Sequence, residues 1–424
     1  MIQSPRKLRF TRDRELAREL RDLTVLIAGS DQNADRVAAL FSAYQALASS
    51  APTVLGEVFA DPIFVGTIRS LIEDIAAPTS GGFSGNGSAS VVYLLGGAAL
   101  GAGYLEERPV QVRLPILTPF VPLSGTRLKL PVDGSSRRQP LIEAEVTAQR
   151  GFLVNGLPVT PVGLPEAADI PFLNAHPGLD EQALAPCRPV SVPILSRWSQ
   201  PLSVAIGLVR ASSAGELIQS FFFGVVEVLG EKNAHVSSTF AGFPGLVALS
   251  FTEDELMLAE ALVHETDHLF LYELLRQAGG PGPSDDDGTR YYSPWRLDPR
   301  PASGLIFGVS AFVRVGCFLA EIRDRLNFRS AARAGERATH ALLQSKQAIE
   351  ILEGECGRMA YTAREIVNVK GKEADQALAL LAREAEFDEW ASVAGERMDR
   401  HYAEWKGAHE ALGRSLTKNW RSRC

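Results

Sequence analysis

The chain has 424 residues, 46% of them hydrophobic, and a formal net charge of −7. This length and composition can bury a large core and are typical of two or three domains, and the acidic pI of about 5.7 argues against a general binder of nucleic acid or anionic membranes. Four scattered cysteines without a CxxC pair, a charged segment over residues 1–22 and no apolar run long enough to cross a bilayer predict a soluble cytoplasmic protein without a signal peptide.

The N-terminal part, residues 1–77, predicts helices. Leu and Ala recur every three or four residues from Arg12 to Ala76, with short breaks near Asp31 and Pro52. Residues 78–105 begin with a Gly- and Ser-rich run that has little apolar surface to bury. We therefore expect a flexible connector over residues 78–105.

Residues 106–212 predict a small, mostly antiparallel β region inserted after the N-terminal helices. Apolar and polar side chains alternate there, which is typical of strands with one buried face. The expected strands are Val110–Leu114, Leu128–Leu130, Leu141–Ala148, Val190–Leu195 and Leu202–Val209.

Residues 213–330 predict a helical core. A helix is expected from Ser213 to Leu229, and a second one begins after Thr252, which forms a capping-box pattern with Glu255. Two glycines and a proline at 279–281 predict the end of this second helix.

The second helix carries the pattern His264-Glu265-Thr266-Asp267-His268. Histidines four residues apart lie on one face of a helix, so both imidazoles can reach one metal ion. Glu265 can then accept a proton from a bound water or orient a ligand. The alternative is two core histidines hydrogen-bonded to backbone or carboxylate groups, and His235 is the best histidine candidate for an additional ligand.

An irregular but ordered segment is expected over Tyr291–Pro301, because three prolines within eight residues exclude a helix. Arg296 and Arg300 lie in this segment. A guanidinium binds a carboxylate through two parallel hydrogen bonds, so these arginines can anchor a carboxylate beside the metal. The alternative is a structural salt bridge to Glu265, Asp267 or a carboxylate of a C-terminal helix.

The rest of the chain predicts long helices. Residues 304–326 are apolar nearly all round, which indicates a buried helix. Residues 331–424 predict a hairpin of two amphipathic helices, Ala331–Val367 and Glu373–Leu416, joined near Lys370 and Gly371. The predicted fold class is thus α+β and predominantly α-helical. Three further histidines on polar helix faces are expected to be solvated: His340, His401 and His409.

Three segments together resemble the HExxH-motif domain family. They are residues 245–250 (Gly-Leu-Val-Ala-Leu-Ser), residues 259–268, which include the two histidines, and residues 292–301 (Tyr-Ser-Pro-Trp-Arg-Leu-Asp-Pro-Arg-Pro). This family occurs beside ribosomally made peptide natural products and is understood as iron(II)- and 2-oxoglutarate-dependent peptide β-hydroxylases. The resemblance covers residues 240–325.

The resemblance implies that His264 and His268 bind Fe(II) and that Arg296 or Arg300 holds a carboxylate of 2-oxoglutarate. The family usually has a third metal-binding histidine before a Gly-Val-x-Ala-Phe run, where this chain has Phe307. Three outcomes remain open. Another group substitutes for that histidine, the site works with two protein ligands, or the metal has been lost; the candidate substitutes are Glu265, Asp298 and His235.

Three functions follow as hypotheses. The first is an oxygenase that uses Fe(II), 2-oxoglutarate and O₂ to hydroxylate a side chain, at Cβ, of a ribosomal precursor peptide. The second is a zinc metallopeptidase in which Glu265 is the general base, although residues 303–321 offer no obvious downstream ligand, Glu or His, before Glu321. The third is a metal-free protein that binds a peptide, a partner protein or a second copy through its C-terminal helices.

Overall fold

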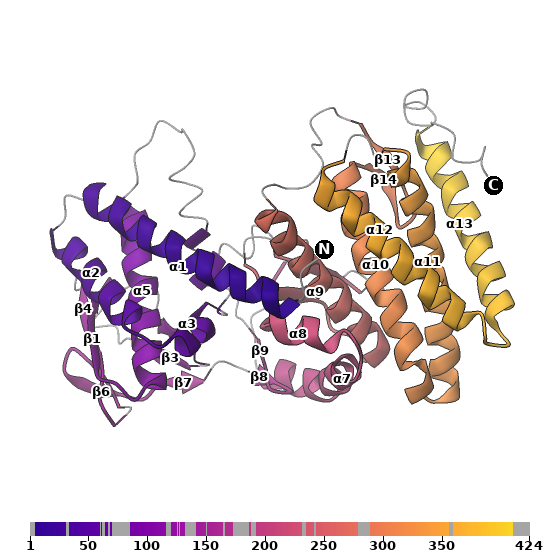
Figure 1. Cartoon of the computed structure of the whole chain (residues 1–424). Helices are drawn as coiled ribbons and strands as arrows, with labels where there is room; N and C mark the ends of the chain where they lie inside the picture. Colours follow the sequence, from indigo (N-terminus) through magenta and orange to yellow (C-terminus); the bar gives the residue numbers. More distant parts are fainter. Residues whose placement is uncertain are drawn as a thin grey trace.

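The chain folds into two lobes, each around its own hydrophobic core, in the computed structural model (Figure 1). The core of the N-terminal lobe runs from Leu16 to Val154, and the core of the C-terminal lobe runs from Ala167 to Trp390. The structure describes residues 5–30, 34–59, 61, 64–66, 68–69, 85–115, 120–124, 126, 128–131, 141–149, 151–163, 166–172, 186–187, 192–230, 235–240, 243–278, 289–355 and 359–409.

Helices of the N-terminal lobe follow the predicted breaks near Asp31 and Pro52. The connector expected over residues 78–105 is wrong from Gly85 onward, where a helix begins; residues 78–84 lie outside the described part. The helix forms because the Val-, Leu- and Ala-rich run after residue 91 is buried against the first strand and the preceding helices. The helices are α1 (Pro5–Ser30), α2 (Ala34–Ala48), α3 (Pro52–Val58) and α5 (Gly85–Leu105).

Glycine is required in α5 for close packing. A Cβ atom on Gly103 would lie 2.6 Å from the side chain of Val110 in the first strand, closer than real atoms approach. Glycine therefore lets this helix lie directly on the sheet.

The predicted antiparallel β region is confirmed over residues 110–171. Alternate residues of the first strand are buried, as the alternating pattern predicts. Asn155 and Gly156 both have positive φ, of 50° and 76°, in the two-residue turn between β5 and β6. A four-stranded sheet has the order β1 (Val110–Leu114), β4 (Ile142–Val146), β5 (Phe152–Val154), β6 (Leu157–Val159); the remaining strands are β2 (Phe120–Leu123), β3 (Leu128–Pro131), β7 (Val162–Gly163), β8 (Glu166–Ala167) and β9 (Ile170–Pro171).

The strands expected at 190–195 and 202–209 are wrong, because the helix α7 (Val192–Arg210) spans both. Its buried residues Trp198, Leu202, Ala205 and Val209 repeat at the helical spacing of three or four. The helix expected over 213–229 ends early. It comprises only α8 (Gly215–Phe221), and the β-branched residues that follow form a buried strand.

Helix α9 (Glu255–Gln277) carries both HExxH histidines and lies between a small sheet and the helix α10 (Ala302–Ile322). Its N-cap is Asp254, whose carboxylate accepts the N–H of Met257 at 3.1 Å, so the predicted capping box of Thr252 and Glu255 is wrong. Thr252 instead accepts the N–H of Asp254. The sheet has the order β10 (Gly224–Glu227), β12 (Leu246–Leu249), β11 (Ser237–Thr239), and only its β10–β12 pair is parallel.

Three C-terminal helices replace the two that the sequence predicts. Lys370 and Gly371, the expected joint, lie inside α12, and Lys370 is buried there. The breaks fall at residues 354–360 and 382–386 instead. These helices are α11 (Phe328–Glu353), α12 (Tyr361–Leu381) and α13 (Phe387–His409), and a short 3₁₀ turn, η2 (Arg323–Arg325), precedes them.

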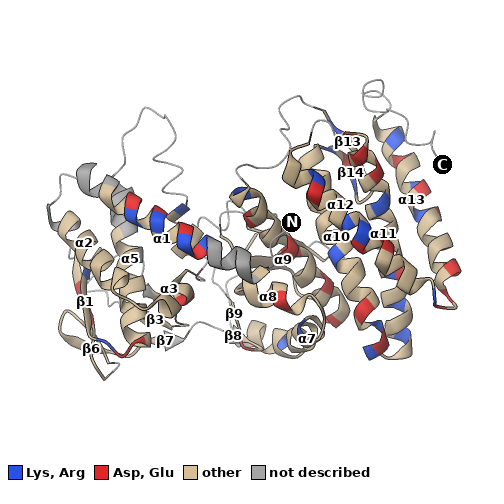
Figure 2. Cartoon of the chain, viewed as in Figure 1, with Lys and Arg blue, Asp and Glu red and all other residues tan. Residues whose placement is uncertain are grey.

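Among the described helices, only the segment Ala302–Arg325, which contains α10, is long and apolar enough to cross a membrane, with a mean hydropathy of 1.9. It packs against α9, α11 and α12, and 67% of its apolar window is buried inside the fold. The buried helix expected over 304–326 is therefore confirmed, and its composition is that of a core helix. Acidic and basic residues alternate along α1 and the C-terminal helices (Figure 2).

Candidate metal centre

The two HExxH histidines lie side by side on α9. Their ring centroids are 4.6 Å apart and the rings are nearly perpendicular, at 80°. Each ring also packs against a phenylalanine of α10, His264 against Phe312 at 4.7 Å and His268 against Phe307 at 5.6 Å between centroids. Both imidazoles are half-buried. The helical spacing therefore brings the two predicted ligands together, as expected.

His268 is in the form that binds a metal. Burial and the neighbouring His264 lower the pKa of His268 to about 4, so its imidazole is neutral at pH 7. Its buried Nδ1 has no hydrogen-bond partner among the described residues. A buried nitrogen without a partner costs free energy, and coordination to a metal would satisfy it.

Glu265 is held by hydroxyl groups of the neighbouring strand β11. Ser237 donates to Oε1 at 2.7 Å, and Thr239 donates to Oε2 at 2.6 Å and to the backbone carbonyl of Glu265 at 2.9 Å. The carboxylate is buried, and both of its oxygens accept a hydrogen bond. Sequence reasoning missed these two hydroxyls, although their spacing of two residues places them on one face of a strand.

His235 has a buried Nε2 with no partner in the described part of the chain, and its Nδ1 lies 3.2 Å from the Ser250 hydroxyl. Burial lowers the pKa of His235, against the raising effect of the Glu265 carboxylate. No three His, Cys, Asp or Glu side chains among the described residues form a cluster that could hold a metal ion. Within the described part of the chain, the arrangement therefore offers two candidate ligands, and no third candidate lies beside them.

Arg296 and Arg300 lie on a two-stranded hairpin, β13 (Tyr291–Ser293) and β14 (Arg296–Arg300), so the expected irregular segment is wrong. The prolines fit because one lies in the turn and one on a strand with a free edge. Both arginines pair with Asp298, at 2.8 and 3.4 Å, and neither pairs with Glu265 or Asp267. Burial raises the pKa of Asp298, and the two arginines together outweigh this effect and lower its pKa below the ordinary value.

Trp295 connects this hairpin to the histidines. Its ring stacks on Phe312 at 4.9 Å, and Phe312 in turn contacts His264. The stack depends on Gly308, where a Cβ atom would lie 2.5 Å from the indole. Tyr292 is buried against Trp405 and Tyr402 of α13, so it is a packing residue.

Three other histidines are less solvated than the sequence predicts. The hydroxyl of Tyr292 lies 2.9 Å from Nδ1 of His401, and Nδ1 of His409 lies 2.8 Å from the carbonyl of Trp405. Burial lowers the pKa of His340. His340 and His401 are covered because α13 packs back onto α11 and the hairpin, whereas the partner of His409 lies in its own helix.

No protein-family model matches this chain, and no curated protein is significantly similar to it. The assignment of the site thus depends on its own chemistry. Two adjacent imidazoles, that of His268 neutral and with an unsatisfied buried nitrogen, fit a divalent first-row metal held at two positions. The aromatic rings of Phe307 and Phe312 close one side of this pair.

Proposed function

We propose that this protein is an iron(II)- and 2-oxoglutarate-dependent oxygenase that hydroxylates a side chain, at Cβ, of a ribosomally made precursor peptide. The observation that carries the proposal is the pair His264 and His268, with the unsatisfied Nδ1 of His268 beside it. The absence of a third ligand among the described residues leaves coordination positions for exogenous groups, as an oxygenase requires.

In this proposal His264 and His268 hold the iron, and Arg296 or Arg300 binds the distal carboxylate of 2-oxoglutarate. Iron bound there would supply the redox chemistry by which one oxygen atom of O₂ enters a C–H bond while the other oxidises 2-oxoglutarate to succinate and CO₂. Phe307 and Phe312 exclude water from one side of the imidazoles. Tyr272, 44% exposed and in contact with Phe307, is the candidate rim residue for the peptide.

The hydrogen bonds of Glu265 favour an oxygenase over a peptidase. A metallopeptidase needs this carboxylate to accept a proton from a metal-bound water. Here both oxygens already accept hydrogen bonds from Ser237 and Thr239 on β11. These bonds support a positioning role for Glu265, which ties the metal-binding turn of α9 to the sheet.

We place the protein in the cytoplasm, where precursor peptides are made. The precursor peptide is the proposed partner, and neither nucleic acid nor a membrane is part of the proposal. The C-terminal helices α11 to α13 are the candidate surface for a partner protein or a second copy.

The test begins with protein purified without oxygen and loaded with Fe(II). The measurements are the bound iron by elemental analysis and the succinate formed from 2-oxoglutarate in air, a slow reaction that such oxygenases carry out without their substrate. We expect one iron per chain and iron-dependent succinate. His264→Ala should abolish both, and His409→Ala, at the end of α13, should change neither.

Two results would overturn the proposal. Stoichiometric zinc that Fe(II) cannot replace, with cleavage of peptides and no succinate, would establish the peptidase instead. Binding of neither metal would leave a peptide- or partner-binding protein.

A further inference from the structure

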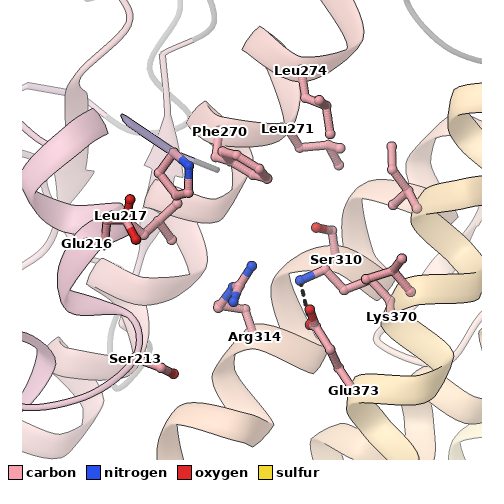
Figure 3. Close-up of a pocket in the computed structure, with 13 residues that line it drawn as sticks. Ser213, Glu216, Leu217, Phe270, Leu271, Leu274, Ser310, Arg314, Lys370 and Glu373 are labelled. Atoms are coloured by element: carbon pink, nitrogen blue, oxygen red, sulfur yellow. Dashed lines mark hydrogen bonds and ion pairs between the residues drawn. The ribbon is translucent and has the colours of Figure 1, made fainter. Parts of the chain in front are cut away.

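A cavity lies along one side of α9, lined by Phe270, Leu271 and Leu274 of this helix and by neither histidine. It has a volume of about 180 Å³ and is bounded by α8, α9, α10, α12 and the first residue of α1, Pro5 (Figure 3). Asp267, next to His268 in sequence, points toward this side, where Ser310 donates to its carboxylate at 2.5 Å and Arg314 at 3.2 Å. No residue of this cavity has a role in the proposed metal site.

One half of the cavity is charged. Arg314 extends into it from α10, and Lys370 of α12 pairs with Glu373 at 3.0 Å (Figure 3). Only Nε of the Arg314 guanidinium has a hydrogen-bond partner among the described residues, which is Asp267. The two terminal nitrogens therefore present an open fork to the cavity, the geometry that binds a carboxylate through two bonds.

The other half of the cavity is apolar. The side chains that line it are Leu217 of α8, Phe270, Leu271 and Leu274 of α9, and Ile366 of α12. A volume of about 180 Å³ is slightly larger than the roughly 150 Å³ of an engineered cavity that binds benzene. The space accommodates an aliphatic or aromatic side chain together with the few atoms that reach the charged half.

The charges around the cavity indicate which net charge a bound ligand should have. Arg314 and Lys370 are balanced by Asp267 and Glu373. A ligand with only a carboxylate would therefore add an uncompensated negative charge in a partly buried site, which is costly. A ligand with a carboxylate and an ammonium group adds no net charge, because its two charges cancel, and the ammonium can lie beside Glu373.

We propose that this cavity binds a free α-amino acid with an apolar side chain. The carboxylate lies on the open fork of Arg314, the ammonium group faces Glu373, and the side chain fills the apolar half. This inference is independent of the proposed oxygenase activity, because it requires neither the metal nor the histidine pair.

Calorimetry with four small probes tests the proposal on the full chain. L-Leucine carries all three groups, 4-methylpentanoate lacks the ammonium, isoamylamine lacks the carboxylate, and glycine lacks the side chain. We expect leucine to bind at least about tenfold more tightly than each of the other three, since each omission removes one matched contact. No binding of leucine at millimolar concentration, or equal binding of leucine and any of the three, would overturn the proposal.

Two variants locate the site. Arg314→Lys keeps the charge opposite Asp267 and removes the fork, so leucine should bind about tenfold more weakly or worse. Val369→Trp fills the cavity from α12 and leaves the charged residues of its lining in the sequence, and it should abolish binding. The matched controls are Arg364→Lys and Leu380→Trp, exposed positions of the same helix, which should bind leucine as the parent does. Unchanged affinity in folded Arg314→Lys or Val369→Trp protein would show that leucine binds elsewhere.

Discussion

Phe307 lies against His268, with ring centroids 5.6 Å apart, on the helix that faces the proposed metal ligands. The family that the sequence resembles has a metal-binding histidine at this position. Because residue 307 contacts His268, a histidine side chain at this position could reach a metal bound by His268. A core residue elsewhere on α10 could not.

Phe307→His should therefore tighten iron or zinc binding, because a third imidazole joins the first two. Metal affinity and thermal unfolding of this variant are measured together. Unchanged affinity with a loss of about 1–3 kcal/mol in stability, the cost of burying an imidazole without a partner, would rule out the assignment of this position.

Metal binding should depend on both histidines. His264→Ala or His268→Ala removes one of two protein ligands, so stoichiometric binding should be lost in either variant. Elemental analysis after dialysis measures it. Retention of the full metal content by both variants would place the metal elsewhere in the chain.

The anchoring of 2-oxoglutarate gives a third prediction. Arg296→Lys or Arg300→Lys should weaken binding of the cosubstrate although the charge is kept, because a lysine cannot form the bidentate pair. Equilibrium binding of 2-oxoglutarate to both variants and to the double variant measures it, with Arg364→Lys as the control. Since both arginines are paired with Asp298, binding also requires them to leave this carboxylate. Parent-like affinity in the double variant would remove the arginines from the site.

The histidine pair could be predicted from the sequence because its geometry is local, set by four residues of helix. The strands from Val110 to Val146 could be predicted for the same reason, since alternation reflects one buried face. Local patterns failed where tertiary packing decided. The apolar residues of α7 were compatible with short strands, and only their burial at helical spacing distinguishes the two.

The surroundings of the histidines depend on contacts between distant segments. Ser237 and Glu265 are 28 residues apart, and Ser310 and Asp267 are 43 apart. No spacing rule connects such pairs, because the sheet and the helix crossings bring them together. The same holds for the Arg314 fork, whose position follows from the packing of α10 against α9 and α12.

The burial and ion pairs of Asp267 predict that its replacement strongly lowers the stability of the fold. It is completely buried, and its carboxylate balances Arg314 and Lys370, whose charged atoms lie 3.2 and 3.9 Å away. Asp267→Asn leaves these cations without that counter-charge, so the free energy of unfolding should fall by about 3–5 kcal/mol. Asp298→Asn, an exposed control, should change it by less than about 0.5 kcal/mol. Urea denaturation compares the two, and equal effects would contradict the role assigned to Asp267.

The hydrogen bonds of Glu273, one of which joins the two lobes, predict how stability changes with pH. Its buried carboxylate accepts hydrogen bonds from Arg276 at 2.6 Å, Gln277 at 2.9 Å and Arg69 at 3.2 Å. Burial raises the pKa of Glu273, but these partners outweigh it and hold the pKa below the ordinary value of 4.5. A lowered folded-state pKa contributes stability above pH 4.5 that is lost as the pH falls toward that lower value. Glu273→Gln should be less stable than the parent at pH 7, and the difference should shrink between pH 5 and pH 3. Chemical denaturation across this range measures it, and a difference that stays constant with pH would show that Glu273 contributes only through packing.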